Sequence, residues 1–508
     1  MQYKHNHIKL KAQTPIQILI LGFLLLLPLL HHAQDGSKLI QIISANSLES
    51  DEVYGKRLIG NVTLLHEGTY MRCDSAYLEP DSNYFHGYGR VRVTKGDSLK
   101  AFSEEMVYNG NTKKGQLIRN VKIIQGDATL KTDMLYYDKG SNLSYYLTGG
   151  EVVQEGARLT SKKGYYHQDE GYFSFREDVV MIDQDFRLES DTLQYYPDSK
   201  RAKIQGPTQI VSDQDSIYSE EGDFFTETKI GHFSKNAVVK SVDQDLYADS
   251  IYFNKMDSIG EAYGHVRMLD KKENVWIHGE TAKQNQKQKR AIVYDRAEML
   301  QIDEEDTLFL HADTLRFVEL PAGKEIYAYR HVKFYREDIQ GKCDSINFAF
   351  SDSLMKMYGS PVLWSDENQI SSDTINLLIY ESKIHELQLF KNSFIISQYD
   401  EERYNQISGK KMTGFFKDNK IVRFDVFGNG QSIYWAEDDD KKLIGVNEIE
   451  CSDIVIYLDD NKIQKIKFIE KPDALFSPPG DKNPQELRLK GFFWDDSNRP
   501  LKREDIFK

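Results

Sequence analysis

The stretch LYADSIY, residues 246–252, contains the pattern on which most of this chain is built. A small residue and an acidic residue are followed, usually, by Ser or Thr, then an aliphatic residue, with an aromatic residue one or two positions later. The pattern recurs as CDSAY at 73–77, TDMLY at 132–136, SDTLQY at 190–195, ADTLRF at 312–317, CDSINF at 343–348 and SDIVIY at 452–457. Its second position holds Asn46, Asp74, Glu104, Asp133, Lys162, Asp191, Glu221, Asp249, Glu280, Asp313, Asp344 and Asp373, at steps of about 28–33 residues. Such a period is typical of repeat proteins.

A second phrase lies between these copies: a turn-forming residue followed by alternating β-branched and polar residues. It reads GRVRV at 89–93, NVKI at 120–123, GEVV at 150–153, NAVV at 236–239, GHVRM at 264–268 and HVKF at 331–334. Period-two alternation beside Gly and Asn is typical of half-buried strands, and clusters such as NGN at 109–111 are typical of turns. We therefore expect two strands and two turns in each repeat. The repeats should stack, because one unit cannot bury its own apolar face.

The recurring acidic residue raises a question of register. Strict alternation places Asp191 on the same face as Leu193 and Tyr195, where an unpaired carboxylate would be costly to bury. Either a bulge turns the residue outward, or it lies at the start of a strand and accepts backbone hydrogen bonds. The sequence leaves both solutions open.

The two ends of the chain depart from the repeat. Lysines at positions 4, 9 and 11 precede an apolar run at 18–30 and the small residue Ala33, which is the order of a secretory signal. A membrane anchor is the alternative, although the run is shorter than the ~20 residues of a spanning helix. We expect a signal peptide at 1–33, regular repeats at 34–320, more divergent repeats at 321–470 and a proline-containing tail at 471–508.

Composition and motifs argue against several classes of function. The formal net charge is −14, whereas a nucleic-acid-binding protein needs a basic surface. We find no nucleophile elbow, HExxH motif, phosphate loop or cysteine pair at metal spacing, and acidic residues that recur throughout the repeats are unlike a single active site. We therefore expect no catalytic residues, no metal site, no cofactor and no enzymatic activity. The three cysteines occupy the small position of the repeat, which predicts packed thiols instead of disulfides.

The repeat resembles the OstA-like family of the lipopolysaccharide-transport system, which includes the periplasmic bridge protein and the N-terminal domain of the outer-membrane translocon. GYGRVRV at 87–93 and LYADSIY at 246–252 carry the resemblance best, and it extends from about residue 40 to 380, more weakly to 460. The tail, with KGFFW at 490–494, resembles the end of Bacteroidetes-type OstA-like proteins.

The resemblance implies an all-β fold, namely an elongated β-jellyroll of stacked strand pairs whose apolar groove holds the acyl chains of lipopolysaccharide. It also implies a location in the periplasm, with association with the outer membrane as a further expectation, and edge-strand stacking with other jellyroll proteins of the pathway. The candidates for the groove, each of which ordinary core packing would also explain, are Val91, Val93, Val121, Ile123, Val152, Leu193, Val238, Ile251, Val266, Leu315 and Val332.

Two other functions fit parts of the pattern. A structural or adhesive cell-surface protein would use the same sheet as a spacer and bind no lipid. A polysaccharide-acting enzyme on a β-solenoid would need one compact cluster of carboxylates, and the sequence contains no evident one.

Overall fold

The structure, a computed structural model, describes residues 39–51, 55–96, 99–302, 306–380, 383–418, 420–438, 440–459 and 462–508. The expected signal peptide lies outside these residues. Among the described residues, no helix has the length and apolar character required to cross a membrane.

The described residues form 36 strands and one short 3₁₀ helix. The first strands are β1 (Gln41–Ser44), β2 (Ser47–Asp51), β3 (Gly55–His66), β4 (Thr69–Glu79), β5 (Tyr84–Lys95), β6 (Leu99–Asn109), β7 (Lys114–Gln125), β8 (Ala128–Asp138), β9 (Leu143–Tyr146), β10 (Gly150–Gln154), β11 (Ala157–Ser161) and β12 (Lys163–His167). The next are β13 (Tyr172–Ile182), β14 (Arg187–Tyr196), β15 (Arg201–Ile204), β16 (Thr208–Val211), β17 (Asp215–Ser219), β18 (Glu221–Phe225), β19 (Ile230–Ser241), β20 (Gln244–Asn254), β21 (Ile259–Asp270), β22 (Val275–Asn285), β23 (Arg290–Ile302) and β24 (Thr307–Leu320). The last are β25 (Gly323–Tyr335), β26 (Gln340–Ala349), β27 (Leu354–Tyr358), β28 (Val362–Ser365), β29 (Asn368–Ser371), β30 (Thr374–Tyr380), β31 (Lys383–Gln398), β32 (Tyr404–Lys417), β33 (Lys420–Glu437), β34 (Leu443–Asp459), β35 (Lys462–Ile469), β36 (Asp473–Ser477) and the helix η1 (Arg503–Phe507).

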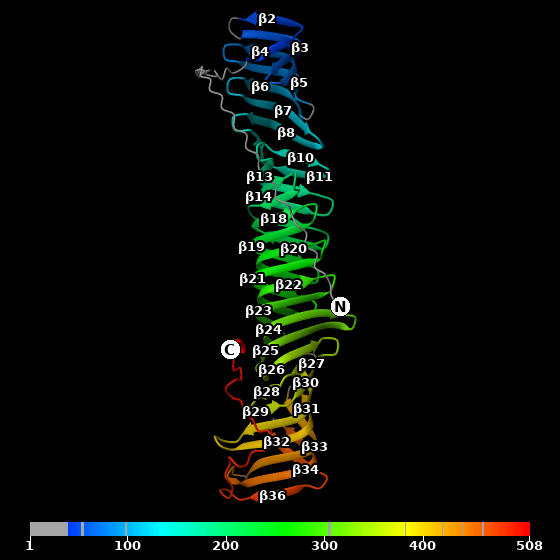
Figure 1. The fold of residues 1–508 in the computed structure, drawn as a ribbon, viewed down its shortest axis with the longest axis vertical. Coiled ribbons are helices and arrows are strands. Elements are labelled where there is room, and N and C mark those ends of the chain that lie inside the picture. The colour runs from blue at the N-terminus through cyan, green and yellow to red at the C-terminus, as the bar shows by residue number, and fades with distance from the viewer. Residues whose placement is uncertain are drawn as a thin grey trace, which may run out of the picture.

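Successive strands pair antiparallel along one long axis, so the chain climbs through the molecule in sequence order (Figure 1). The hairpin of β24 and β25 is paired from Phe309 to Leu320, with Gly323 opposite Leu320 at its turn. Pairing then continues from β25 to β26. The expected all-β fold of stacked repeats, each with two strands and two turns, is confirmed.

A bulge near the middle of most long strands explains the recurring acidic residue. Where β3 pairs with β4, Gly60 and Asn61 lie opposite the single residue Asp74. Both have left-handed φ angles, 77° and 50°. Left-handed pairs recur at 89–90, 119–120, 235–236, 264–265 and 330–331. The turn-forming residues of the second sequence phrase therefore lie inside strands, at bulges, and not only between strands.

The bulge keeps the same face of the strand inward on both sides of it. In β4 the buried residues are Met71 and Cys73 before the bulge and Ala76 and Leu78 after it, so the alternation skips one position. Asp74 falls at that position with its side chain 44% exposed. The bulge is therefore the solution to the register question, because the apolar alternation of β4 shifts by one position there and the acidic residue turns outward.

The small residue of the repeat satisfies a backbone carbonyl at the bulge. Ser190 Oγ donates to the carbonyl of Thr192 at 3.1 Å, and Ser103, Ser161 and Ser372 donate in the same way to the residue two positions later. Cys343 Sγ makes the equivalent contact with the carbonyl of Ser345 at 3.4 Å. All three cysteines are free. The position accordingly takes small side chains, which donate to this carbonyl where they are Ser, Thr or Cys, whereas Ala248 and Ala312 only pack there.

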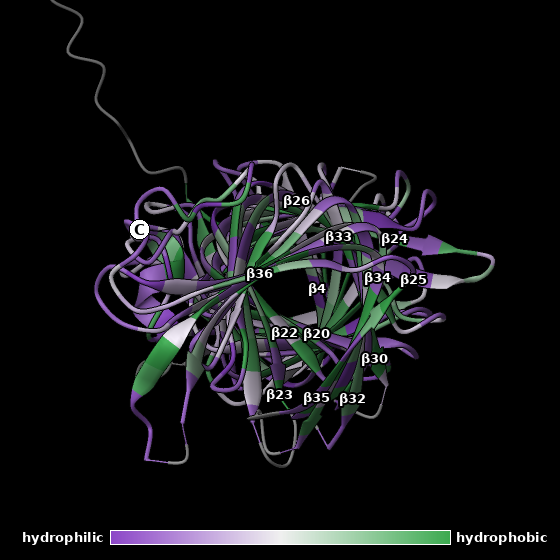
Figure 2. Ribbon diagram, turned by 90° about the horizontal axis from the view of Figure 1, so that it is seen from below, coloured by the Kyte–Doolittle hydropathy of each residue, from purple (hydrophilic) through white to green (hydrophobic). Residues whose placement is uncertain are grey.

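Each bent strand contributes its two halves to two facing walls. In places the halves are separate strands: β10 pairs with the first half of β8, whereas β9 pairs with its second half. The two walls enclose the buried apolar side chains, and Figure 2 shows the ribbon of the walls viewed along the axis, coloured by hydropathy. One buried cluster runs from Ile40 to Leu135 and a second, larger one from Leu159 to Ile456.

The end of the chain folds back along the outside of the stack. β36 pairs with β34, so the last repeat strand extends to Ser477, past the boundary that we expected at 470. The segment after it packs Leu487 against Trp435 and Ile433. It then continues to Phe507, whose ring lies 4.7 Å from that of His311, and the C-terminus lies beside β25 (Figure 1). After β36 the tail therefore covers one flank of the stack.

Candidate functional site

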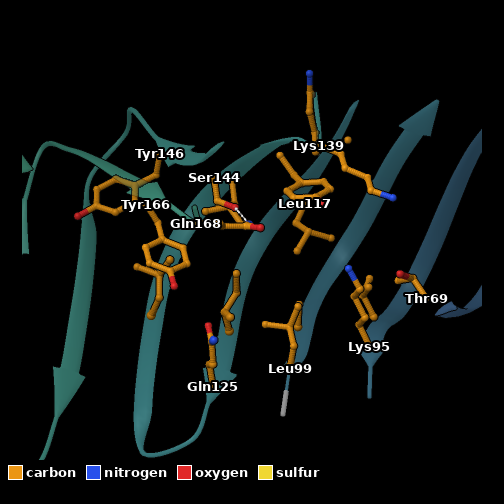
Figure 3. Close-up of a pocket in the computed structure, with 18 of the residues that line it drawn as sticks. Thr69, Lys95, Leu99, Leu117, Gln125, Lys139, Ser144, Tyr146, Tyr166 and Gln168 are labelled. Atoms are coloured by element: carbon orange, nitrogen blue, oxygen red, sulfur yellow. Dashed lines mark hydrogen bonds between the residues drawn. The ribbon is translucent and has the colours of Figure 1, made fainter. Parts of the chain in front are cut away.

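A cavity of about 630 Å³ lies between the two walls over β3 to β13. Its apolar lining comes from alternate residues of successive strands, as the bulged register requires. That lining consists of Met71, Val93, Leu99, Ala101, Met106, Leu117, Ile123, Ala128, Leu130, Leu135, Val152, Phe173 and Phe175. Figure 3 shows Leu99 and Leu117 in the middle of this space, with Lys95 and Lys139 towards its margin. The volume falls within the range of sites that bind small molecules, roughly 300–1,000 Å³.

Two further cavities continue along the axis. One of about 350 Å³ shares Val152, Phe173 and Phe175 with the first, so the two adjoin. A third, of about 120 Å³, shares Asp185 and Lys229 with the second and extends to β22. We call the series of three cavities the trough. It follows the stacking direction, as expected if each repeat adds one more layer of the same apolar lining.

Glycines make room for an aromatic side chain in the wall of the trough. A Cβ atom at Gly150 or Gly164 would lie 2.4 Å from ring atoms of Tyr146, so only glycine fits at these two positions. The Tyr146 hydroxyl lies 2.8 Å from Ser161 Oγ. Burial raises the pKa of Tyr146 to about 12. Its ring therefore presents a neutral surface to the trough at physiological pH.

Charged side chains bridge the two walls at the mouth of the trough, where the turns of the two walls meet. Glu67, in the turn after β3, pairs with Lys139 and, at 2.9 Å, with Lys113. Hydrogen bonds from Lys139 and then Lys113 lower the pKa of Glu67 to about 2. Just inside this network, His66 Nδ1 lies 3.0 Å from the hydroxyl of Tyr108, and both side chains are buried. The trough thus has an apolar interior and an ionised margin.

The structure divides the eleven residues expected in the groove into three groups. Val93, Ile123 and Val152 line the first cavity, and Ile251 lines the third. The core residues, which line none of the three cavities, are Val91, Val121, Leu193, Val266, Leu315 and Val332. Val238 is half-buried and belongs to neither group, whereas its neighbours Ala237 and Val239 are on the apolar interior.

Several lining residues were missed because they belong to positions that the sequence phrases do not mark. Leu99, Leu130 and Phe173 lie towards the ends of their strands, whereas Leu117 and Phe175 lie shortly before the bulges of β7 and β13. The sequence does contain a signal for these residues, because each of them continues the inward alternation of its strand beyond the repeated phrase. At the residues directly after a bulge, the two walls converge. Side chains such as Val91 and Val121 fill the interior there.

Comparison with known families identifies the region that contains the trough. The family described as OstA-like protein matches residues 38–191 and 174–249. Residues 38–249 are thus similar to the OstA-like family. The first two cavities are lined only by residues of this OstA-like region, and the third extends past it to Gln286.

Comparisons with individual proteins add solved structures. Curated proteins give no match to the chain. One solved structure that does match is described as LptH, the LptA homologous periplasmic component of the conserved lipopolysaccharide transport device from Pseudomonas aeruginosa. The identity is 13%, the match covers 28% of this chain and 99% of that chain, and the TM-score is 0.22.

Among the described residues, no group of three or more His, Cys, Asp or Glu side chains is arranged to hold a metal ion. What the trough offers is an elongated apolar lining with charges along one side, which suits a ligand that has long hydrocarbon chains and a polar end.

Proposed function

We propose that this chain is a non-enzymatic carrier in lipopolysaccharide transport, which shields acyl chains in its trough as they cross the periplasm. The observation that carries the proposal is the trough itself: three adjoining cavities, the first and third lined mainly by apolar side chains and the second by apolar and polar ones, located in and next to the OstA-like region. The family relationship supports a role in the same transport system.

The physical need for such a carrier follows from the cost of hydrating hydrocarbon. Each methylene group taken from an apolar environment into water costs roughly 0.8 kcal/mol, so a chain of about a dozen carbons costs on the order of 10 kcal/mol. A lining that continues along the axis allows a chain to move without meeting water at each step. The stacked architecture supplies this continuity, because adjoining cavities share Val152 and Phe173.

Site-specific photocrosslinking tests the proposal. A photoreactive amino acid in place of Ile123 or Ile251, which both line the trough, should capture lipopolysaccharide in cells. Matched controls at the exposed neighbours Lys122 and Asp249 should not. Equal crosslinking at buried and exposed positions, or none at any of them, would contradict a lipid-binding trough. Surface accessibility of the chain to protease on intact cells, together with no lipid crosslink, would favour the structural or adhesive alternative.

The two ends of the stack provide docking edges for partners. At one end β1 and β2 pair only with β3 among the described strands, and they expose Ile42, Ile43 and Leu48. At the other end β35 and β36 pair with β34, and Leu475 and Phe476 are exposed. Unpaired strand edges bind further strands through backbone hydrogen bonds. We infer head-to-tail stacking with other jellyroll proteins of the pathway.

Substitution of Ile43 by proline tests this docking, because proline removes a backbone donor from an edge strand. The variant should lose co-purification with jellyroll partners while keeping the thermal stability of the wild type. The same substitution at Lys122, in the interior of the sheet, should instead destabilise the fold. Unchanged partner binding by the Ile43→Pro variant would place the contact elsewhere.

A further inference from the structure

The ion pairs that cross the mouth of the trough share one orientation. Glu67 pairs with Lys113 and Lys139, Glu155 with Lys200, and Asp185 with Lys229; beyond the third cavity, Asp270 pairs with Lys324 in the same way. In every one of these pairs the carboxylate comes from one series of turns and strand ends, and the lysine from the opposite series. We call these two sets of residues the acidic lip and the basic lip.

These pairs differ from the ion pairs at the bulges. A bulge pair such as Lys163 with Glu177 joins adjacent strands 14 residues apart. The mouth pairs join residues 72, 45 and 54 positions apart for Lys139, Lys200 and Lys324. They therefore connect different repeats of the two walls, and each must separate before a bulky group passes sideways between the lips.

The lysines of the basic lip lie where a polar head group would be if hydrocarbon filled the trough. Lys139 lines the first cavity, Lys200 the second, and Lys229 both the second and the third. Lys229 Nζ also lies 4.6 Å from the centre of the ring of the buried Phe186. Each ammonium group is thus at the boundary between apolar lining and solvent, with an aliphatic stem reaching to the interior.

We propose that the basic lip binds phosphate groups of the transported lipid, which replace the carboxylates of the acidic lip as partners of the lysines. The inference rests on the proposed function, and it adds a head-group site and an opening step to it. A phosphate monoester carries about −1.5 to −2 charges near neutral pH, whereas each carboxylate carries one. A lysine released from Glu67 or Glu155 gains a partner of higher charge, and the two lips separate as it does so.

The proposal predicts opposite effects from the two lips. Loss of lysines, in the double variant Lys139→Gln/Lys200→Gln, should weaken binding of phosphorylated lipid about tenfold, the effect of losing about 1.4 kcal/mol of charge-assisted contacts. Loss of their partners, in Glu67→Gln/Glu155→Gln, should strengthen it, because the lysines no longer have a competing carboxylate. If the ion pairs only hold the two walls together, both variants open the mouth and change the affinity for lipid in the same direction.

The experiment measures dissociation constants of the purified full chain for two probes, lipid A and its dephosphorylated form, with inorganic phosphate as a third. The lysine variant should lose affinity for lipid A and bind the dephosphorylated lipid within about twofold of the wild type. Lys163→Gln, which removes a bulge pair of the same chemistry, should bind both lipids as the wild type does. Thermal melts verify folding, and the single variant Lys200→Gln repeats the test with a smaller perturbation.

Three outcomes overturn the inference. Changes of the same sign in the lipid affinity of both double variants would show that the ion pairs only hold the walls together. The proposed function would not be affected. Binding of inorganic phosphate with the same lysine dependence, but lipid affinity without it, would show a site for free anions only. Failure of the wild type to bind either lipid would overturn the proposed function and the head-group site together.

Discussion

The guanidinium of Arg503 donates two hydrogen bonds to the carboxylate of Glu298, at 2.9 and 2.8 Å, across 205 residues of sequence. Arg503 begins η1 at the end of the chain, and Glu298 lies in β23 with a side chain that is 4% exposed. A buried carboxylate needs such partners, since an unpaired one would be costly. The pair therefore fastens the tail to the middle of the stack.

Removal of this guanidinium should release the end of the tail. Arg503→Ala leaves Glu298 with the imidazole of His278, whose Nδ1 lies 3.4 Å away, and the loss of charge-assisted hydrogen bonds costs roughly 1.5–3 kcal/mol. Hydrogen exchange should show lost protection in 499–508, with the strands of the stack unaffected. Arg187→Ala, which removes an exposed pair with Glu189, is the control and should change little. Wild-type protection in the Arg503 variant would contradict a fastening role.

The same attachment should depend on pH. Burial raises the pKa of Glu298, but hydrogen bonds from His278 and Arg503 outweigh it, and the net pKa lies below the ordinary value. A carboxylate whose pKa is depressed on folding contributes stability that is complete above its unfolded pKa, about 4.3, and is lost as pH falls through the lower folded value. Proteolysis of the tail by an acid-active protease should therefore increase below about pH 4. A Glu298→Gln variant should show a smaller change over that range.

Glycine at the bulge should be hard to replace. Gly89 has a φ of 74°, and an added Cβ would lie 2.5 Å from Asp74 Oδ2. Gly89→Ala should cost about 1–2 kcal/mol from the left-handed backbone alone, and more from the contact. Asp74→Ala removes only an exposed ion pair with Arg90 and should cost less than about 1 kcal/mol. Thermal melts measure both, and the double variant should recover part of the loss at Gly89. Equal costs for the two single variants would contradict this account.

The repeat could be predicted from the sequence because the bulge requires the same kinds of residue in each copy. Cys73, Asp74 and Gly89 are all visible in the sequence as one periodic pattern, since each occupies a fixed place at the bend. That pattern predicted the all-β stacked fold and the turns. It left open only whether the acidic residue lies at a bulge or at the start of a strand.

The cavities were not predictable, because inward alternation is the same for a residue that fills the interior and one that lines a space. Val91 and Val93 alternate identically, yet only Val93 lines a cavity. The path of the tail could not be predicted for another reason. The side-chain amide of Gln406 donates to the carbonyl of Leu487, but nothing in the repeat around Gln406 indicates that its partner lies in the tail.

Native cysteines should react slowly with alkylating reagents. Burial raises the pKa of the Cys73 thiol to about 11 and that of Cys343 to about 12. Because the thiolate is the nucleophile, only about one molecule in a thousand or fewer has it at pH 8. Iodoacetamide should label these residues after denaturation and not before. Rapid native labelling of Cys73 would contradict its packing at the bulge.

A carboxylate placed inside the trough should abolish lipid binding without unfolding the stack. Ile123 is half-buried and lines the first cavity, so the side chain of Ile123→Asp would face the space that the acyl chains are proposed to occupy. A charge there stays partly hydrated in the empty protein, but an apolar ligand would strip away its water at a cost of several kcal/mol. We expect at least about a tenfold loss of affinity for lipopolysaccharide. Lys122→Asp changes the exposed neighbour on the opposite face and should bind lipid nearly as the wild type does. If the two variants bind lipid equally while both melt as the wild type does, the acyl chains do not occupy this cavity.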